Sequence, residues 1–219
     1  NGAGVLSLSG NNTYTGDTTI NAGTLEIAST GLLGGGNYSG NIVNNGSLLI
    51  ASNSNQILSG AISGIGALTK NGTGTLTLSG NNNYSGGTTL NTGTLNINNA
   101  TALGTATFTI AGGTIDNTSG SAKTLTNNNT QNWNGNFTFA GTRDLNMGTG
   151  NVTMNASRTV TVNSGTLTVG NMRGVGYSLT KNGSGTLTIS SQGSGLWTGN
   201  TTVNSGTLHE IVTVNAAGF

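Results

Sequence analysis

The chain has 219 residues, only 5% of them charged, and its formal net charge is +1. Six scattered Lys and Arg residues supply no phosphate-binding surface, so we expect no nucleic-acid partner. The absence of cysteine excludes disulfides and thiolate metal sites, and no apolar run approaches the ~18–20 residues that a membrane-spanning helix needs.

The composition favours many short strands over one large core. Hydrophobic residues make up 32% of the chain, Gly occurs 39 times and Pro is absent. Disordered chains usually combine high net charge with few β-branched residues, whereas here the net charge is small and Thr, Val and Ile are frequent. We therefore expect short strands that are joined at Gly and Asn corners and stacked so that each buries a thin core.

A long sequence unit occurs three times along the chain. Residues 68–97 read LTKNGTGTLTLSGNNNYSGGTTLNTGTLNI, residues 1–27 read NGAGVLSLSGNNTYTGDTTINAGTLEI, and residues 179–210 read LTKNGSGTLTISSQGSGLWTGNTTVNSGTLHE. Such a return predicts a repeat architecture, and copies near both ends predict that residues 1–219 form a single continuous body. Because the first copy lacks the LTK of the other two, we also expect the chain to be a fragment of a larger precursor, and the removal of a signal or leader segment would explain the missing LTK equally well.

A shorter motif within the unit marks tight corners. It consists of an apolar residue, Asn, any residue, Gly, Thr or Ser, and Leu, and it occurs at residues 20–25, 43–48, 90–95, 162–167 and 203–208. Asn and Gly tolerate positive φ, so the motif predicts a strand, a corner and a second strand. The gaps between successive copies of its Asn are close to multiples of ~20–24 residues, a size that suits one coil of a β-solenoid.

The strand segments alternate with period 2, as in TLTL at residues 75–78, which places the apolar residues on one face and Thr on the other. No segment shows an apolar stripe of period 3.6, so the fold class predicted from the residues is all-β. Leu68 and Leu90, and likewise Leu76 and Leu95, are expected to stack one coil apart at the ~4.8 Å spacing of neighbouring strands. About ten coils would give a rod on the order of 50 Å long.

Between the copies the pattern is looser. We predict strands at residues 107–110, 137–139, 152–154 and 159–169, and a corner or an internal Asn ladder at residues 126–132. Residues 51–66 are interpreted as an enlarged coil or a lateral loop. The tail, residues 211–219, begins as a strand and then leaves the motif.

A second recurring motif is an aromatic residue, one polar residue and Gly. Its aromatic residues are Tyr14, Tyr38, Tyr84, Trp133 and Trp197. Placement this regular favours rings that are packed over a coil corner. The alternative is that the five rings form a sugar-stacking surface, since aromatic faces bind the apolar faces of sugars.

The ionisable side chains predict no catalytic residue, no metal site and no cofactor. His209, the only histidine, falls at an outward strand position. The carboxylates are Asp17, Glu26, Asp116, Asp144 and Glu210, and they form no evident pair of the kind that glycoside hydrolysis requires. Calcium-binding β-rolls need a repeated G-G-x-G-x-D pattern, which is missing. Lys70 and Lys181 share one repeat position and are interpreted as solvated corner lysines.

The pattern LTKxGxGTLTLSGxNxYxGGTTxNxGTLxI at residues 68–97 resembles the autotransporter-associated β-strand repeat, which is found in secreted passenger regions of Gram-negative type V secretion proteins. The three long copies carry the resemblance in full and the intervening coils in part. The resemblance implies a right-handed parallel β-helix that is exported through the outer membrane and displayed on, or released from, the cell surface. It does not imply an activity.

These observations leave three hypotheses for function. The leading one is a non-enzymatic, extracellular stalk or adhesin segment, whose partners would be surface glycans or proteins of a host or of neighbouring cells. The second is a fibre subunit whose copies stack head-to-tail through uncapped β-helix ends. The third is a carbohydrate-active β-helix enzyme, which would require Asp116, Arg143 and Asp144 to assemble into a cluster on one face.

Overall fold

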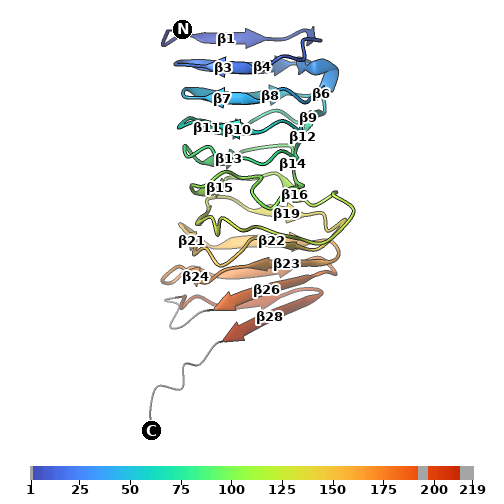
Figure 1. The fold of residues 1–219 in the computed structure, drawn as a ribbon. Coiled ribbons are helices and arrows are strands. Elements are labelled where there is room, and N and C mark those ends of the chain that lie inside the picture. The colour runs from blue at the N-terminus through green and yellow to red at the C-terminus, as the bar shows by residue number, and fades with distance from the viewer. Residues whose placement is uncertain (1, 192–196, 213–219) are drawn as a thin grey trace.

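A computed structural model describes residues 2–191 and 197–212, and these residues form a stack of short strands (Figure 1). The only helix among them is a 3₁₀ turn, η1 (Gly34–Gly36). No helix in the described ranges is long and apolar enough to span a membrane. The strands are β1 (Val5–Leu8), β2 (Asn11–Asn12), β3 (Thr18–Ile20), β4 (Thr24–Ser29), β5 (Leu32–Leu33), β6 (Asn37–Tyr38), β7 (Ile42–Asn44), β8 (Ser47–Ser52), β9 (Gln56–Leu58), β10 (Ile62–Ser63), β11 (Ala67–Lys70), β12 (Thr75–Leu78), β13 (Thr88–Leu90), β14 (Thr94–Ile97), β15 (Phe108–Ile110), β16 (Thr114–Asp116), β17 (Lys123–Thr124), β18 (Gln131–Trp133), β19 (Phe137–Phe139), β20 (Leu145–Asn146), β21 (Val152–Met154), β22 (Arg158–Val162), β23 (Thr166–Val169), β24 (Met172–Arg173), β25 (Leu179–Asn182), β26 (Thr186–Ser191), β27 (Thr201–Val203) and β28 (Thr207–Val212).

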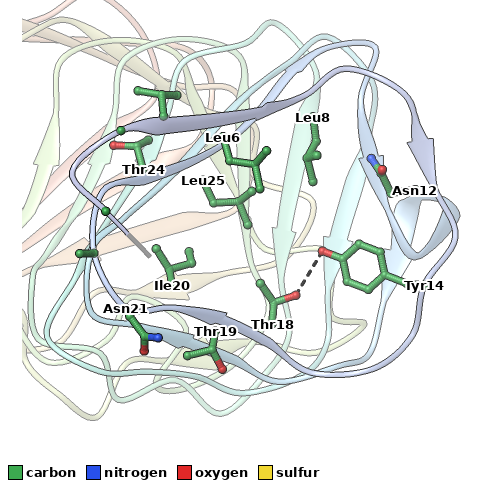
Figure 2. A pocket seen from close by; sticks show the side chains of 14 residues that line it. Leu6, Leu8, Asn12, Tyr14, Thr18, Thr19, Ile20, Asn21, Thr24 and Leu25 are labelled. Atoms are coloured by element: carbon green, nitrogen blue, oxygen red, sulfur yellow. Dashed lines mark hydrogen bonds between the residues drawn. The ribbon is translucent and has the colours of Figure 1, made fainter.

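All strands except the separate pair β2-β5 form three faces of a parallel β-helix. Face 1 is the nine-stranded sheet β1-β4-β8-β11-β13-β15-β18-β21-β24, and face 2 is the nine-stranded sheet β6-β9-β12-β14-β16-β19-β22-β25-β27. Face 3 consists of β3-β7-β10 in the N-terminal coils and β17-β20-β23-β26-β28 in the C-terminal coils. The first coil runs clockwise from Leu6 through Tyr14 to Ile20 as it recedes in Figure 2, so the winding is right-handed, as parallel crossover connections nearly always are.

Successive coils are held in register by main-chain hydrogen bonds between parallel strands. On face 1, Val5 pairs with Thr24, and Thr24 pairs in turn with Ser47, so the first coil is shorter than the second. The central steps are uniform, since Leu48 pairs with Leu68 and the register then advances evenly through β13 to β15. The solenoid of about ten coils, and the coil length of roughly 20–24 residues predicted from the corner motif, are thus confirmed.

Inward side chains stack into ladders that run along the helix axis. On face 2, Leu76 stacks on Leu95, as predicted, and Leu95 stacks on Ile115. All three side chains are fully buried. The alternation of strand residues therefore builds a continuous apolar core from only one or two inward side chains per strand.

Three details of the sequence interpretation are wrong. Residues 51–66 are not an enlarged loop, because β9 and β10 lie in faces 2 and 3 and keep the register of the neighbouring coils. Leu68 stacks on Thr88, and Leu90 stacks on Lys70 rather than on Leu68. Residues 159–169 form two strands, β22 and β23, on different faces, because the Asn-Ser-Gly corner at 163–165 separates them. The tail beyond Val212 lies outside the described residues.

The three long copies lie on different faces of the helix. In the first copy, β3 is on face 3 and β4 is on face 1. In the second copy, the equivalent strands β13 and β14 are on faces 1 and 2, and in the third copy β27 and β28 are on faces 2 and 3. Each copy is therefore rotated by one face relative to the copy before it. Equivalent residues of the three copies consequently point away from the axis in three different directions.

We predict that Leu95→Ala lowers the free energy of unfolding by ~2–5 kcal/mol, because it leaves a cavity between Leu76 and Ile115 in a ladder with no solvent access. Urea unfolding followed by circular dichroism measures the loss. Thr94→Ala is the matched control on the outward side of the same strand and should stay within ~0.5 kcal/mol of the parent chain. Equal losses in the two variants would contradict the ladder as the source of stability.

Candidate functional site

The most unusual group in the structure is a buried lysine at a corner of the second copy. Lys70 ends strand β11, and its side chain is only 1% exposed. Its neighbours in the ladder are Ile50 and Leu90, so its methylene groups pack where other coils carry aliphatic residues. The ammonium donates hydrogen bonds to the carbonyl oxygens of Gly72 and, at 3.5 Å, of Thr92.

The third copy repeats this arrangement on face 2. Lys181 lies in the corresponding strand β25, is 0% exposed and lies between Val160 and Val203. Its Nζ donates to the carbonyl oxygens of Asn182 at 2.9 Å, Gly183 at 2.8 Å and Ser205 at 3.2 Å. Three N–H groups thus meet three main-chain acceptors, which satisfies the full donor capacity of an ammonium.

The predicted solvated lysines are therefore wrong for both positions. Lys70 follows Leu68 by two residues, and side chains two apart on a strand lie on the same face. Since Leu68 is a core residue, Lys70 must point inward with it. The period-2 pattern of LTK contained this signal, and the expectation that charged residues occupy solvated corners concealed it.

Burial without a counter-charge shifts the titration of both lysines. Desolvation lowers the pKa of Lys70 from 10.5 to about 8, and it also lowers the pKa of Lys181. No charged neighbour contributes to either shift, because each ammonium is surrounded by main-chain carbonyl groups.

In both places a glycine one coil later closes over the buried lysine. The lysine, the corner that follows it and this glycine are called a lysine corner below. A Cβ on Gly93, which has φ of +75°, would lie 2.7 Å from the Nζ of Lys70 and would also collide with the carbonyl oxygen of Gly72. A Cβ on Gly206, with φ of +70°, would lie 2.9 Å from the Nζ of Lys181. Only Gly provides both the left-handed backbone and the space for the ammonium.

Three of the five aromatic rings that were considered for sugar stacking are in the core. Tyr38, Tyr84 and Trp133 are at most 1% exposed. The hydroxyl groups of Tyr84 and Thr88 are 2.5 Å apart, which ties the ring to the strand that follows the corner. A shared aromatic surface is therefore absent from the described residues. Tyr14, which is 41% exposed, and Trp197, which is partly buried, retain accessible ring area.

The three residues that a carbohydrate-active enzyme would require as a cluster, Asp116, Arg143 and Asp144, lie near one another, but main-chain groups engage each of them. Asp116 is buried, and its carboxylate accepts hydrogen bonds from the N–H groups of Asn117 and Thr142 and from the Thr142 hydroxyl. Asp144 accepts from the N–H of Thr166. The Arg143 guanidinium donates to the carbonyl oxygens of Gly120 and Thr142.

Other ionisable groups are dispersed over the described surface. Glu26 lies on face 1 and His209 lies on face 3, where it is exposed as predicted. Asp17 accepts a hydrogen bond from the N–H of Asn41. Within residues 2–191 and 197–212, no three His, Asp or Glu side chains are grouped so that they could hold a metal ion.

A hollow of about 490 Å³ opens at the first coil (Figure 2). Its lining includes Leu6, Leu8, Ile20 and Leu25, which point into it, and Tyr14, whose hydroxyl is 3.2 Å from that of Thr18. The positions of Leu6, Leu8 and Leu25 are the same ones that form the apolar ladders of later coils. The hollow is therefore the interior of a coil, with no arrangement of polar groups that would select a small ligand.

Comparison with known proteins identifies the repeat that builds these corners. Residues 1–27, 68–97 and 179–209 match the family described as the passenger-associated-transport-repeat. The segments are autotransporter passenger repeats. A curated relative, the "Adhesin BmaC autotransporter" of Brucella suis biovar 1 (strain 1330), is 35% identical over an alignment of 122 residues that covers 41% of this chain and 4% of the relative.

The chain thus spans 4% of the length of the curated relative that it matches. No solved structure matches the chain. The second passenger repeat, residues 68–97, contains both Lys70 and the Gly93 that closes over it. The third, residues 179–209, contains both Lys181 and Gly206. A single passenger repeat therefore contains both the buried lysine and the glycine that closes over it one coil later.

The lysine corners make the stability of the passenger repeats depend on pH. Lys70 has a pKa of about 8 in the folded chain and an ordinary pKa of 10.5 when it is exposed, so the unfolded chain binds more protons between these limits. Stability must then rise as the pH increases through this window, by up to ~3 kcal/mol for Lys70. We expect urea midpoints to increase between about pH 7.5 and about pH 9.5.

The control for this pH dependence is Lys70→Met together with Lys181→Met, which should remove the increase. Burial raises the pKa of Tyr84, so this tyrosine lowers stability only above its unfolded pKa of 10. It therefore does not contribute to the change between about pH 7.5 and about pH 9.5. An identical pH dependence in the parent chain and the double variant would contradict the assignment to the two lysines.

We predict that Gly93→Ala destabilises the second passenger repeat by more than ~2 kcal/mol, because the methyl group would meet the carbonyl oxygens of Gly72 and Gly74 and the ammonium of Lys70. Gly16→Ala is the control, since a Cβ there meets no atom within 4 Å. Chemical denaturation of both variants measures the difference. Equally small effects at the two glycines would contradict a tightly closed corner.

Proposed function

We propose that this chain is a surface-exposed, non-enzymatic β-helical segment of an adhesin passenger. The observation that carries the proposal is that its three autotransporter passenger repeats form successive parts of one stack of parallel coils. The segment extends the passenger away from the cell and offers its outer faces for contact. The name of the curated relative, which is an adhesin, supports the same assignment.

The outer faces suit recognition by hydrogen bonds rather than by charge. On face 2, five consecutive coils carry a partly exposed threonine in register, and these residues are Thr75, Thr94, Thr114, Thr138 and Thr161. Such a row places hydroxyl groups at the ~4.8 Å spacing of neighbouring strands. We propose that glycans, or uncharged polar surfaces of host or neighbouring-cell proteins, are the partners of these faces.

The two buried lysines leave four cationic side chains for the outside of the molecule, which supports the expectation of no nucleic-acid partner. The enzymatic hypothesis has less support, because Asp116 is buried and occupied by main-chain and hydroxyl donors. A role of Tyr14 and Trp197 in sugar contact stays a prediction, as does head-to-tail stacking of copies.

The proposal predicts that Fab fragments raised against this chain label intact cells that make the full-length protein, and that they reduce the attachment of those cells to their target surface. Flow cytometry before and after permeabilisation measures the labelling, and counts of attached cells measure the second effect. Fab fragments against a cytoplasmic protein are the control. Labelling that requires permeabilisation would contradict surface exposure, and undiminished attachment would contradict a contact role.

A further inference from the structure

Four corners of the described chain carry an asparagine followed by a glycine, at residues 45–46, 71–72, 134–135 and 182–183. Such a pair is chemically labile, because the main-chain nitrogen of the glycine can attack the side-chain carbonyl carbon of the asparagine and close a five-membered ring. Glycine has no side chain to hinder the attack. The rate at each pair therefore depends on whether the fold leaves that nitrogen free to react.

The stacking of coils engages the glycine nitrogen at two of the four pairs. The N–H of Gly72 donates to the carbonyl oxygen of Ile50 at 3.2 Å, and the N–H of Gly135 donates to that of Ile110 at 3.0 Å. Both acceptors belong to the preceding coil, so ring closure at either pair must first break a hydrogen bond between coils. These two pairs are protected by the fold.

The pair at residues 45–46 lacks this protection. It forms the corner between β7 and β8, and Asn45 is exposed. In the described part of the chain, the N–H of Gly46 makes no hydrogen bond. The side-chain oxygen of Asn45 accepts from the N–H of Ile65 at 3.4 Å, which is too long to hold the side chain firmly. The nucleophile and the carbonyl group are thus both available at this corner.

The pair at residues 182–183 is intermediate between these cases. The N–H of Gly183 also makes no hydrogen bond within residues 2–191 and 197–212. Asn182, however, is the last residue of β25, and its side-chain oxygen accepts from the amide of Asn204 at 2.8 Å. Its main-chain oxygen accepts from the ammonium of Lys181 at 2.9 Å. Asn182 is therefore held more firmly than Asn45.

We propose that Asn45 is a site of self-modification, at which the fold permits the conversion of a neutral amide into a carboxylate. The Gly46 nitrogen gives its proton to water and forms a bond with Cγ of Asn45. The bond from Cγ to Nδ2 breaks as Nδ2 takes up a proton, so ammonia leaves and a succinimide remains. Water then opens this ring. Opening at Cγ gives aspartate, and opening at the main-chain carbonyl gives isoaspartate, whose main chain runs through Cβ and Cγ.

The fold tolerates the first product and resists the second. Asp144 already accepts the N–H of Thr166 one coil later, as the side chain of Asn45 does in its own stack, so an aspartate fits this type of corner. Isoaspartate adds a methylene group to the main chain. The corner has no room for it, since even a Cβ on Gly46 would lie 2.3 Å from the carbonyl oxygen of Gly23.

The new carboxylate changes the surface around this corner. Val43 is 38% exposed and Ile65 is 72% exposed, and both lie beside Asn45. Loss of one neutral amide lowers the formal net charge from +1 to 0. An uncharged, partly apolar corner thus becomes acidic as the protein ages. The reaction is independent of the proposed adhesive role, because it depends only on the geometry of the corner.

The test follows conversion at the four pairs by peptide mapping with mass spectrometry, at mildly alkaline pH, in the folded chain and in urea. In the folded chain we expect Asn45 to react at least about fivefold faster than Asn71 and Asn134, since each of these must lose a hydrogen bond between coils. In urea the four rates should become similar. A rate at Asn71 or Asn134 equal to that at Asn45 in the folded chain, or an unchanged ranking in urea, would overturn the proposal.

Two variants provide a second measurement on the intact protein. Asn45→Gln requires a six-membered ring and should not react on the same timescale, and Asn45→Asp carries the aspartate product from the start. On isoelectric focusing, the aged parent chain should gain an acidic band that migrates with Asn45→Asp and that aged Asn45→Gln lacks. The same band at equal intensity in the aged parent and in aged Asn45→Gln would contradict Asn45 as the main site.

Discussion

The main-chain hydrogen bonds between successive coils are the interaction on which the rest of the structure depends. They set strands of neighbouring coils ~4.8 Å apart, and they force each inward side chain to meet the side chain of the same ladder position. Leu76, Leu95 and Ile115 are in contact for this reason, and so are Ile50, Lys70 and Leu90. A coil therefore has no independent core, and every corner must fit the corner of the next coil. The left-handed glycines such as Gly93 follow from this constraint.

The same constraint explains why the repeat does not create a repeated surface. Each passenger repeat occupies two adjacent faces, and each successive copy begins one face further around the axis. Glu26, Asn96 and His209 are equivalent in sequence, but they lie on faces 1, 2 and 3. A binding surface built from equivalent positions would be divided among three directions. The repeat instead provides side chains that pack between neighbouring coils. The outer rows that do align, such as Thr94 with Thr114, combine residues from inside and outside the repeats.

The sequence was sufficient to predict the fold class, the coil length and the ladder of Leu76 with Leu95, because these depend on strand periodicity and on a corner motif that recurs. It was not sufficient for the pairing of Leu68. That pairing depends on the lengths of the intervening corners, which differ from coil to coil and leave no trace in the strand pattern. The buried aromatic rings Tyr38, Tyr84 and Trp133 could be assigned to corners but not to the core, because their burial is supplied by the adjacent coils. The burial of Lys70 follows from its period-2 relation to Leu68, but it runs against the general preference of lysine for solvent.

Four charged side chains of this chain bridge neighbouring coils, and three of them are buried. Lys70 and Lys181 bind corner carbonyls, Asp116 binds the N–H of Thr142 across neighbouring coils, and Asp144 binds the N–H of Thr166 in the same way. A carboxylate or an ammonium that bridges two coils at a corner satisfies main-chain groups that the strands leave without partners. The outer faces are left with hydroxyl and amide groups and few charges. In the proposed adhesive role such faces would form only weak, salt-insensitive contacts one at a time. That role would require many contacts in parallel, which a stack of similar coils offers.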